Sequence, residues 1–197
     1  SFNLSAKGDG RSSDGKLELD TSQQGFDPDP DGTGADNYST PTYISIMGQQ
    51  ELGLALSVLS VSPSSVLGVF DVVTQLNAKN TGNLLVSNAQ IEFDLIGSLP
   101  SSVLVSDISV PVVSGDINGP NLGYDGAIFT SLLSGVEELK PDEDVRVEVS
   151  FKLDVRSESL EDYGPYNMSA LLTGVAPDGS LVQDLSDAGL DPKTSAG

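Results

Sequence analysis

The sequence contains no cysteine, no histidine and no tryptophan. Without cysteine and histidine there is no disulfide, no catalytic thiol, no Ser-His-Asp triad and no zinc site of the usual kind. Without tryptophan, and with aromatic residues at only 6% of the chain, the usual platform for stacking sugar rings is also missing. Carboxylates are therefore the main chemical groups that the sequence offers.

Basic residues are scarce as well. Nine Lys and Arg stand against 29 Asp and Glu, which gives a formal net charge of -20. Such a surface repels nucleic acids and anionic membranes and attracts cations, divalent ones above all. No stretch is long and apolar enough to insert into a bilayer. We therefore expect neither nucleic acid nor membrane as a partner.

Alternation of apolar and polar residues predicts the strands. The clearest case is 145–155, for which we expect a central strand with Phe151 facing the core. Residues 89–95 alternate in the same way. A third stretch, 72–80, places these four residues on one face: Val72, Thr74, Leu76 and Ala78.

Shorter apolar or β-branched runs occupy the rest of the chain, separated by clusters of Gly, Pro, Asn and Asp. These runs are 43–46, 54–61, 102–106 and 127–133. No segment shows a sustained helical period. The pattern predicts an all-β protein with an immunoglobulin-like antiparallel β-sandwich.

An internal repeat is the most informative feature. Residues 2–28 align without a gap on residues 166–192, at a constant offset of 164 positions. The identical pairs include Ala6 and Ala170, Gly10 and Gly174, Gly15 and Gly179, Asp20 and Asp184, Ser22 and Ser186, and Pro28 and Pro192. We expect one repeat of a tandem array: residues 1–38 are the tail strand of a preceding repeat plus an acidic linker, 39–192 the complete sandwich, and 193–197 the start of the next linker.

The order of motifs resembles the immunoglobulin-like "conserved repeat" modules of giant bacterial tandem-repeat cell-surface proteins, adhesins among them. The matching pieces are TPT (40–42), LNAKNTGNLLVSNAQIEFDL (76–95), NLGYDGAIFTSLLSG (121–135), LKPDEDVRVEVSFKLDV (139–155), YGPYNMSALLTG (163–174) and PDGSLVQDLSDAGLDP (177–192). They cover nearly all of the complete repeat. They are specific for the type of module and not for a ligand.

The resemblance implies an extracellular stalk or extender module of a filament, with calcium at acidic linkers and no enzymatic activity. The implied partners are adjacent repeats of the same polypeptide or neighbouring copies, and a surface ligand elsewhere in the full-length protein. One departure concerns the second linker copy, which reads DPKTSAG where the first reads DPDPDG. That difference puts an acidic site at the second junction in doubt.

The acidic stretch GFDPDPDGTGADN (25–37) is the first candidate metal site. Asp27, Asp29 and Asp31 followed by Gly32 match the first half of a calcium-binding loop, in which alternate side chains converge on the ion. Asp36 is a further candidate ligand. Tyr38 stands where such a loop has its last Glu, and the intervening prolines favour an extended path. The alternatives are a calcium site and a stiff, solvated linker.

A second candidate lies in SGDINGPNLGYDG (114–126). Its oxygen donors are Asp116, Asn118, Asn121 and Asp125. Asn and Asp also stabilise turns by accepting bonds from their own backbone, and this interpretation is favoured here.

Paired carboxylates in VEELKPDEDV (136–145) could serve glycoside hydrolysis if they were held at the right separation. The run precedes the clearest strand and contains Pro141, so we expect a solvated loop instead. Three functions stay open at this stage: a structural extender, a module that binds a glycan or host surface, and a subunit that polymerises by donating its N-terminal strand. A carboxylate-based hydrolase is a further hypothesis, and the lack of His and Cys together with the repeated architecture counts against it.

Overall fold

The computed structural model describes residues 2–4, 7–11, 17–21, 42–44, 48–110, 112–115, 119–134, 137–157 and 164–192. The chain divides into two compact units, Ser1–Met47 and Gly48–Gly197. Within the described ranges every regular element is a strand, which confirms the all-β prediction. No helix in those ranges is long and apolar enough to cross a membrane.

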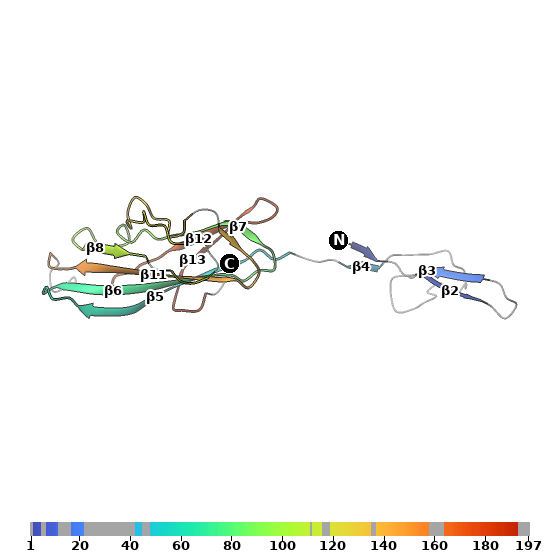
Figure 1. Ribbon diagram of the computed structural model, residues 1–197, viewed down its shortest axis with the longest axis horizontal. Helices are drawn as coiled ribbons and strands as arrows, with labels where there is room; N and C mark the ends of the chain where they lie inside the picture. The colour runs from blue at the N-terminus through green and yellow to red at the C-terminus, as the bar shows by residue number, and fades with distance from the viewer. Residues whose placement is uncertain are drawn as a thin grey trace. The chain divides into compact units, whose positions relative to one another are not determined.

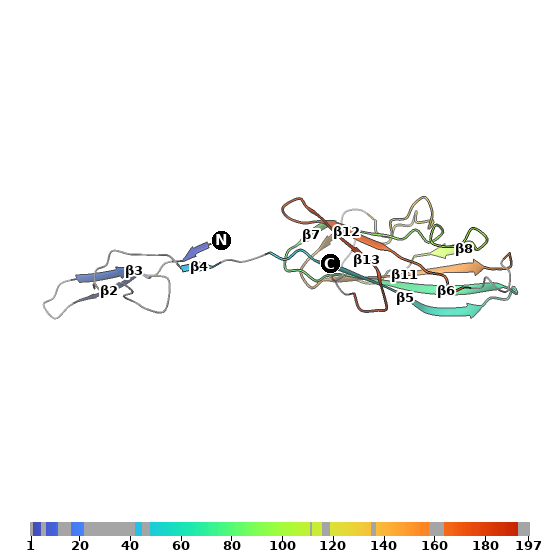
Figure 2. The same cartoon turned by 180° about the vertical axis from the view of Figure 1, so that it is seen from behind.

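The second unit is a β-sandwich, as predicted (Figure 1). Its strands are β5 (Leu52–Pro63), β6 (Val69–Asn80), β7 (Val86–Glu92), β8 (Leu104–Ser109), β9 (Val112–Ser114), β10 (Glu137–Leu139), β11 (Asp144–Asp154), β12 (Leu171–Val175), β13 (Leu181–Leu185) and β14 (Asp187–Ala188). One sheet has the order β10-β7-β12-β13 and the other β14-β5-β6-β11-β8, with β9 also paired to β11. The short β14 runs parallel to β5, and the other pairs are antiparallel. Figure 2 shows the same two layers from behind.

Strand β11 lies between β6 and β8, so the predicted central position is confirmed. Its residues alternate between buried and partly exposed along the whole strand. Phe151 is 4% exposed and belongs to the core between the sheets. The period-two pattern is visible in the sequence because one face of this strand packs against the other sheet and the opposite face meets water.

The predicted faces of the two neighbouring alternating stretches are also confirmed. All of their core-facing residues are buried: Val72, Thr74, Leu76 and Ala78 from β6, and Ala89, Ile91, Phe93 and Leu95 from β7 and the segment after it. The hydroxyl of Thr74 donates to the carbonyl of Val149 over 3.2 Å, which satisfies a polar group inside the core.

The opposite face of β6 is covered too, although its residues are polar. Gln75 and Asn77 are 7% and 8% exposed. The Gln75 amide donates to Asn77 Oδ1 over 2.8 Å, and the Asn77 amide donates to the carbonyl of Leu190. The segment after β13 therefore crosses this face and is fastened there by amide side chains.

The apolar run 127–133 does not form a regular strand. It contributes only isolated bridges, Glu92 to Ser131 and Pro120 to Leu133. Ile128 is 82% exposed and Phe129 is 60% exposed. Hydrogen bonds to the Asp125 carboxylate hold residues 127–129 in a turn, whereas Leu132 and Leu133 are buried in the core. The apolar composition of the run therefore predicted its burial only in part.

The first unit contains β1 (Phe2–Leu4), β2 (Lys7–Arg11), β3 (Leu17–Thr21) and β4 (Thr42–Ile44). Strand β1 pairs antiparallel with β4, and β2 pairs antiparallel with β3. The β2–β3 hairpin runs from the pair Lys7–Thr21 to the pair Arg11–Leu17. At the offset of 164 these positions become the ends of the β12–β13 hairpin, Leu171 with Leu185 and Val175 with Leu181. The two copies of the sequence repeat therefore share the same strand bounds and the same pairing register.

Candidate functional site

The acidic loop at the start of the chain lies outside the described residues. This holds for all four of its candidate ligands, Asp27, Asp29, Asp31 and Asp36. The calcium site there stays a prediction.

The second candidate set lies only partly within the described residues, because Asp116 and Asn118 fall outside them. Asn121 Oδ1 accepts a hydrogen bond from the Gly123 amide over 3.0 Å, and its Nδ2 donates to the Ser131 carbonyl over 2.9 Å. The two oxygen-donor positions that are described, Asn121 and Asp125, both hold backbone turns, in line with the favoured interpretation.

Asp125 accepts three backbone amides on one carboxylate oxygen. The amides of Ala127, Ile128 and Phe129 lie 2.9 to 3.0 Å from Asp125 Oδ1. The amides of Ala127 and Phe129 are the main reason why the pKa of Asp125 is lowered. Beside it, the buried Tyr124 hydroxyl donates to the Phe93 carbonyl over 2.9 Å, and burial, followed by the charges of Asp94 and Asp125, raises its pKa.

The carboxylates of 136–145 do not all lie in a solvated loop. Glu138, Asp142 and Asp144 are exposed, and Asp142 lies 3.2 Å from Lys79 Nζ. Glu137 is only 3% exposed, because it sits in β10 opposite Ala89 of β7. The predicted solvated loop is therefore wrong for Glu137, because this residue lies in a short edge strand of the sheet. Across the described ranges, no three acidic side chains lie close enough together to hold a metal ion.

The β12–β13 hairpin is held to the rest of the sandwich by residues that the repeat shares. Asp184 is 5% exposed, and its Oδ2 accepts the Leu54 amide of β5 over 2.7 Å. Ser186 Oγ accepts the Ala170 amide over 2.9 Å. The Cα of Gly174 packs so closely on β7 that an added Cβ would lie 2.3 Å from Val86 Cγ1. Hydrogen bonds and close backbone packing thus fasten the hairpin to both sheets.

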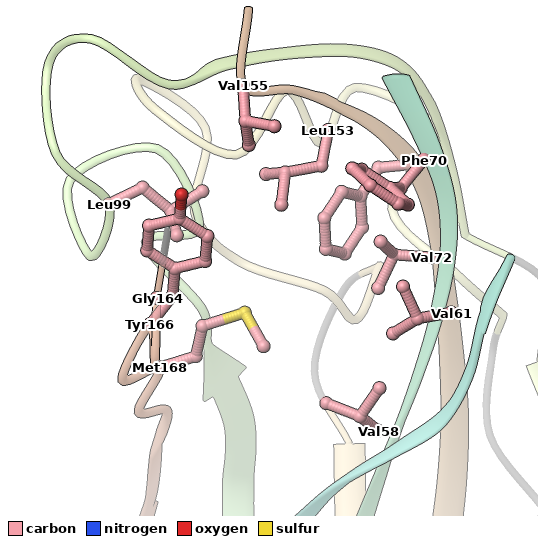
Figure 3. A pocket seen from close by; sticks show the side chains of 11 residues that line it. Val58, Val61, Phe70, Val72, Leu99, Leu153, Val155, Gly164, Tyr166 and Met168 are labelled. Carbon is pink, nitrogen blue, oxygen red and sulfur yellow. The ribbon is translucent and has the colours of Figure 1, made fainter. Parts of the chain in front are cut away.

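An apolar pocket of about 320 Å³ opens at the end of the sandwich where β5 finishes (Figure 3). Its lining consists of Val58, Val61, Phe70, Val72, Leu99, Phe151, Leu153, Val155, Gly164, Tyr166 and Met168. Figure 3 shows Leu99, Tyr166 and Met168 on one side of the space and Val58, Val61 and Val72 across from them. No charged side chain lines it.

The pocket is accessible because β5 is buried in its first part and exposed in its second part. Residues 52–56 are buried, whereas residues 58–63 are largely exposed. Val58 is 46% exposed and Val61 is 59% exposed. Strand β14 pairs with β5 only at Ala55 and Leu56, so among the described strands nothing pairs with the free edge of β5 beyond them. On the other side of the pocket, residues 164–170 run in irregular conformation.

A second pocket, of about 300 Å³, lies beside Glu92 and Asp94. Both oxygens of Glu92 are already bonded, to the hydroxyls of Thr130 over 2.5 Å and Ser131 over 2.6 Å. Asp94 accepts the Gly97 amide over 2.8 Å. These carboxylates therefore form hydrogen bonds with other groups of the same chain.

Sequence reasoning missed the apolar pocket. The available signal was the run 54–61, whose valines continue past the point where the strand is covered. It had also noted Asp184 as a repeated residue without a role. An Asp retained in both copies of a hairpin was the signal for its buried bond to Leu54.

Comparisons with known proteins add little. No family model matches the sequence, and no curated protein sequence matches it. Among solved structures, the chain is similar to the N-terminal domain of PorA, with 7% identity, 70% of this chain and 97% of that chain covered, and a TM-score of 0.29. It is also similar to a beta-glucosidase from Kluyveromyces marxianus, with 12% identity, 73% and 15% covered, and a TM-score of 0.21. TM-scores this low carry no argument about function.

Proposed function

We propose that this chain is an extender module of a long bacterial cell-surface filament or adhesin, in which successive sandwiches are joined by acidic junctions that bind calcium. The observation that carries the proposal is the duplicated hairpin. The pairs of β2 and β3 have the same bounds and register as those of β12 and β13, 164 positions earlier. Two copies of a hairpin at a constant offset, one ahead of the sandwich and one within it, are what a tandem array contains.

The residues that recur in both copies support this interpretation. Asp184, Ser186 and Gly174 fasten the β12–β13 hairpin to β5, to the residue before β12 and to β7. Their counterparts at the offset of 164 are Asp20, Ser22 and Gly10. The first copy therefore keeps the residues that such a hairpin needs in order to dock on a sandwich.

One residue position disfavours a polymer in which identical chains donate their N-terminal hairpin to one another. In that arrangement the β2–β3 hairpin of one copy would replace β12–β13 in another. Leu172 is fully buried in the core, and its counterpart in the first copy is Gly8. Removing such a side chain typically costs about 2–5 kcal/mol in lost burial and cavity formation. The first hairpin thus suits a preceding sandwich with a different core.

A glycan-binding role lacks support from the geometry of the apolar pocket. Sugar sites combine an aromatic platform with polar side chains that bond hydroxyl groups. The lining consists of valines, leucines, two phenylalanines, Met168, Gly164 and Tyr166, and it has no charged or amide side chain. An extender role therefore fits the molecule better than a glycan-binding role.

Small-angle X-ray scattering on the full chain tests the proposed calcium junction. We expect millimolar calcium to narrow the distribution of distances between the two units, because the ion removes repulsion among Asp27, Asp29 and Asp31. Asp29→Asn combined with Asp31→Asn should abolish the change. A matched control, Glu138→Gln with Asp142→Asn, removes the same charge from exposed positions and should retain it.

Identical scattering with and without calcium, in wild type and in both variants, would contradict a calcium-stiffened junction. The surface location is tested separately, by labelling intact producing cells with an antibody against this chain. We expect the antibody to label intact cells, and we expect this labelling to disappear when protease is added outside the cells. Labelling seen only after the cells are broken would contradict the proposal.

A further inference from the structure

A loop of the sandwich presents three large apolar side chains to solvent. Leu122 is 92% exposed, Ile128 is 82% exposed and Phe129 is 60% exposed. All three belong to residues 122–129, the apolar loop. Single exposed apolar residues are common on protein surfaces, whereas several of them in one place mark an interaction surface.

Hydrogen bonds fix the conformation of the apolar loop before any partner binds. Asp125 Oδ1 accepts the backbone amides of residues 127–129, and the Asp125 amide donates to the Phe129 carbonyl over 3.2 Å. The Ile96 amide donates to the Gly126 carbonyl over 2.8 Å, which ties the loop to the body of the sandwich. Because the loop is already ordered, little conformational entropy is lost when its side chains are buried by a partner.

The apolar pocket has the properties of a receptor for such side chains. Its volume is about 320 Å³, and no charged side chain lines it. An aromatic side chain that fills an apolar pocket is a common anchor of protein interfaces, because it removes much apolar area from water. A charged segment would have to lose its hydration in the same place without gaining a partner.

We propose that two copies of this chain associate by placing the apolar loop of each in the apolar pocket of the other. The loop and the pocket lie close together in one molecule because segment 94–99 reaches both. Ile96 bonds Gly126 of the loop, and Leu99 lines the pocket (Figure 3). A twofold axis between two copies then brings each loop to the other pocket, and twofold dimers are the commonest oligomers.

Charge determines how this association depends on salt. Each copy has a formal net charge of -20, so two copies repel each other at low ionic strength. The contacts themselves are apolar, so added salt screens the repulsion without weakening an ion pair. Two small contacts form a weak interface, and we expect dimers only at high micromolar concentration and above. The pairing does not rest on the extender function.

Sedimentation equilibrium of the full chain, measured without calcium, tests the association. We expect a monomer–dimer equilibrium whose association constant rises at least about threefold between about 0.05 and about 0.5 M sodium chloride, because salt screens the repulsion. Species that keep growing beyond the dimer would contradict the twofold arrangement. Monomers alone at millimolar concentration, at both salt concentrations, would overturn the proposal.

Three substitutions that add the same charge test the two surfaces. Phe129→Asp changes the loop and Val61→Asp changes the pocket wall, and each should weaken dimer formation at least about tenfold, because a carboxylate does not enter an apolar pocket without a partner. Leu181→Asp is the control, since Leu181 lies in β13 and lines no part of the pocket. It should leave the association within about threefold of wild type.

The three positions are matched in exposure, at 60%, 59% and 66% for Phe129, Val61 and Leu181. Circular dichroism should therefore be unchanged in all three variants, because none of these side chains is buried. Equal losses of association in the three variants would show that added charge alone weakens the dimer, and would overturn the proposal.

A spin label shows where the loop docks. The sequence has no cysteine, so Ala127→Cys creates a unique attachment point beside Phe129 on the exposed side of the loop. Spin-labelled copies mixed with copies labelled with nitrogen-15 should broaden the amide signals of pocket residues 58–61 and 151–155. The same label on Leu181→Cys should leave those signals sharp.

Broadening that avoids the pocket, or equal broadening by the two labels, would overturn the proposal. Octanol is the probe for another occupant: if it shifts the pocket signals of a chain that stays monomeric, the pocket belongs to a small apolar ligand and the proposal fails. All of these measurements are made without calcium. Failure of the dimer is therefore distinguishable from failure of the calcium-stiffened junction, which is tested by calcium-dependent scattering.

Discussion

At the scale of single residues, the burial of Phe151 links the most regular strand to the facing sheet. The side chain is 4% exposed and belongs to the common core. We expect Phe151→Ala to lower the free energy of unfolding by about 3–5 kcal/mol, the usual cost of removing a buried aromatic ring. Urea denaturation followed by circular dichroism measures the loss.

Phe129 provides the matched control for that substitution, since it is 60% exposed. Phe129→Ala should change the unfolding free energy by no more than about 0.5 kcal/mol. Comparable losses in the two variants would mean that Phe151 contributes no more to the core than a surface residue.

The carboxyl of Asp178 should titrate in acid well below its ordinary range. Its Oδ1 accepts the Ser180 hydroxyl over 2.6 Å and the Ser180 amide over 2.9 Å. These bonds, the hydroxyl first, lower its pKa from 3.8 to about 2. A carboxyl whose pKa is depressed by folding stabilises the folded state above its unfolded pKa, and this contribution is lost as the pH falls through the folded value.

The pH window for Asp178 therefore extends from about 3.8 down to about 2. A carbon-13 NMR titration of the side-chain carboxyl should show a midpoint near the lower limit. Ser180→Ala removes the hydroxyl and should move that midpoint upward. A midpoint at the ordinary value in the wild-type protein would contradict the hydrogen-bonded turn.

At the scale of elements, the contact of β12 with β7 depends on a glycine that both copies of the hairpin keep. A Cβ on Gly174 would lie 2.3 Å from Val86 Cγ1. Gly174→Ala should destabilise the sandwich by about 1–3 kcal/mol, because a well-packed core does not accommodate an extra methyl group. Thermal unfolding measures the change.

A second substitution shows whether that collision is the cause. Val86→Ala removes the opposing methyl groups and is itself destabilising, since Val86 is fully buried. The two changes together should cost less than the sum of each alone, by at least about 0.5 kcal/mol of coupling. Strictly additive losses would show that Gly174 is needed for another reason.

Several elements were predictable because their burial follows the strand period. The stretch 145–155 has one face in the core along its whole length, so alternation in the sequence reports burial directly. In 72–80 alternation marks the core face, although Gln75 and Asn77 on the opposite face are buried as well. The run 127–133 was not predictable by the same rule. Its first part, 127–129, sits in a turn held by Asp125, whereas Leu132 and Leu133 are buried in the core without a regular strand. Composition does not distinguish an apolar turn from an apolar strand.

At the scale of the whole molecule, calcium should act on the junction and hardly on the sandwich. The core of the sandwich lies within Gly48–Gly197, whereas the acidic loop belongs to Ser1–Met47. Affinity of about 10⁻⁴ to 10⁻³ M is typical of extracellular calcium modules. Calcium at ten times its dissociation constant stabilises the calcium-bound conformation by only about 1.4 kcal/mol.

We therefore expect the melting temperature of the sandwich to stay constant as calcium rises to ten millimolar. Calorimetric titration should meanwhile show uptake by the wild type and none by Asp29→Asn combined with Asp31→Asn. A calcium-dependent rise in melting that persists in the double variant would place an ion within the sandwich instead.

The sequence by itself determined the all-β class, the core face of the central strands and the duplication of residues 2–28 at 166–192. Each of these follows from a pattern that can be read along the chain, either alternation within a strand or identity at a constant offset of 164 positions. The same local order marked Asn121 and Asp125 as turn formers, because Asn and Asp bond their neighbours in the chain.

Only the tertiary structure decided the apolar pocket, the burial of Glu137 and the bond between Asp184 and Leu54. These depend on residues far apart in the chain: β5 meets the 164–168 segment at the pocket, and Asp184 reaches across 130 positions to Leu54. A side chain's neighbours along the sequence do not reveal such contacts, since packing of the two sheets brings the partners together.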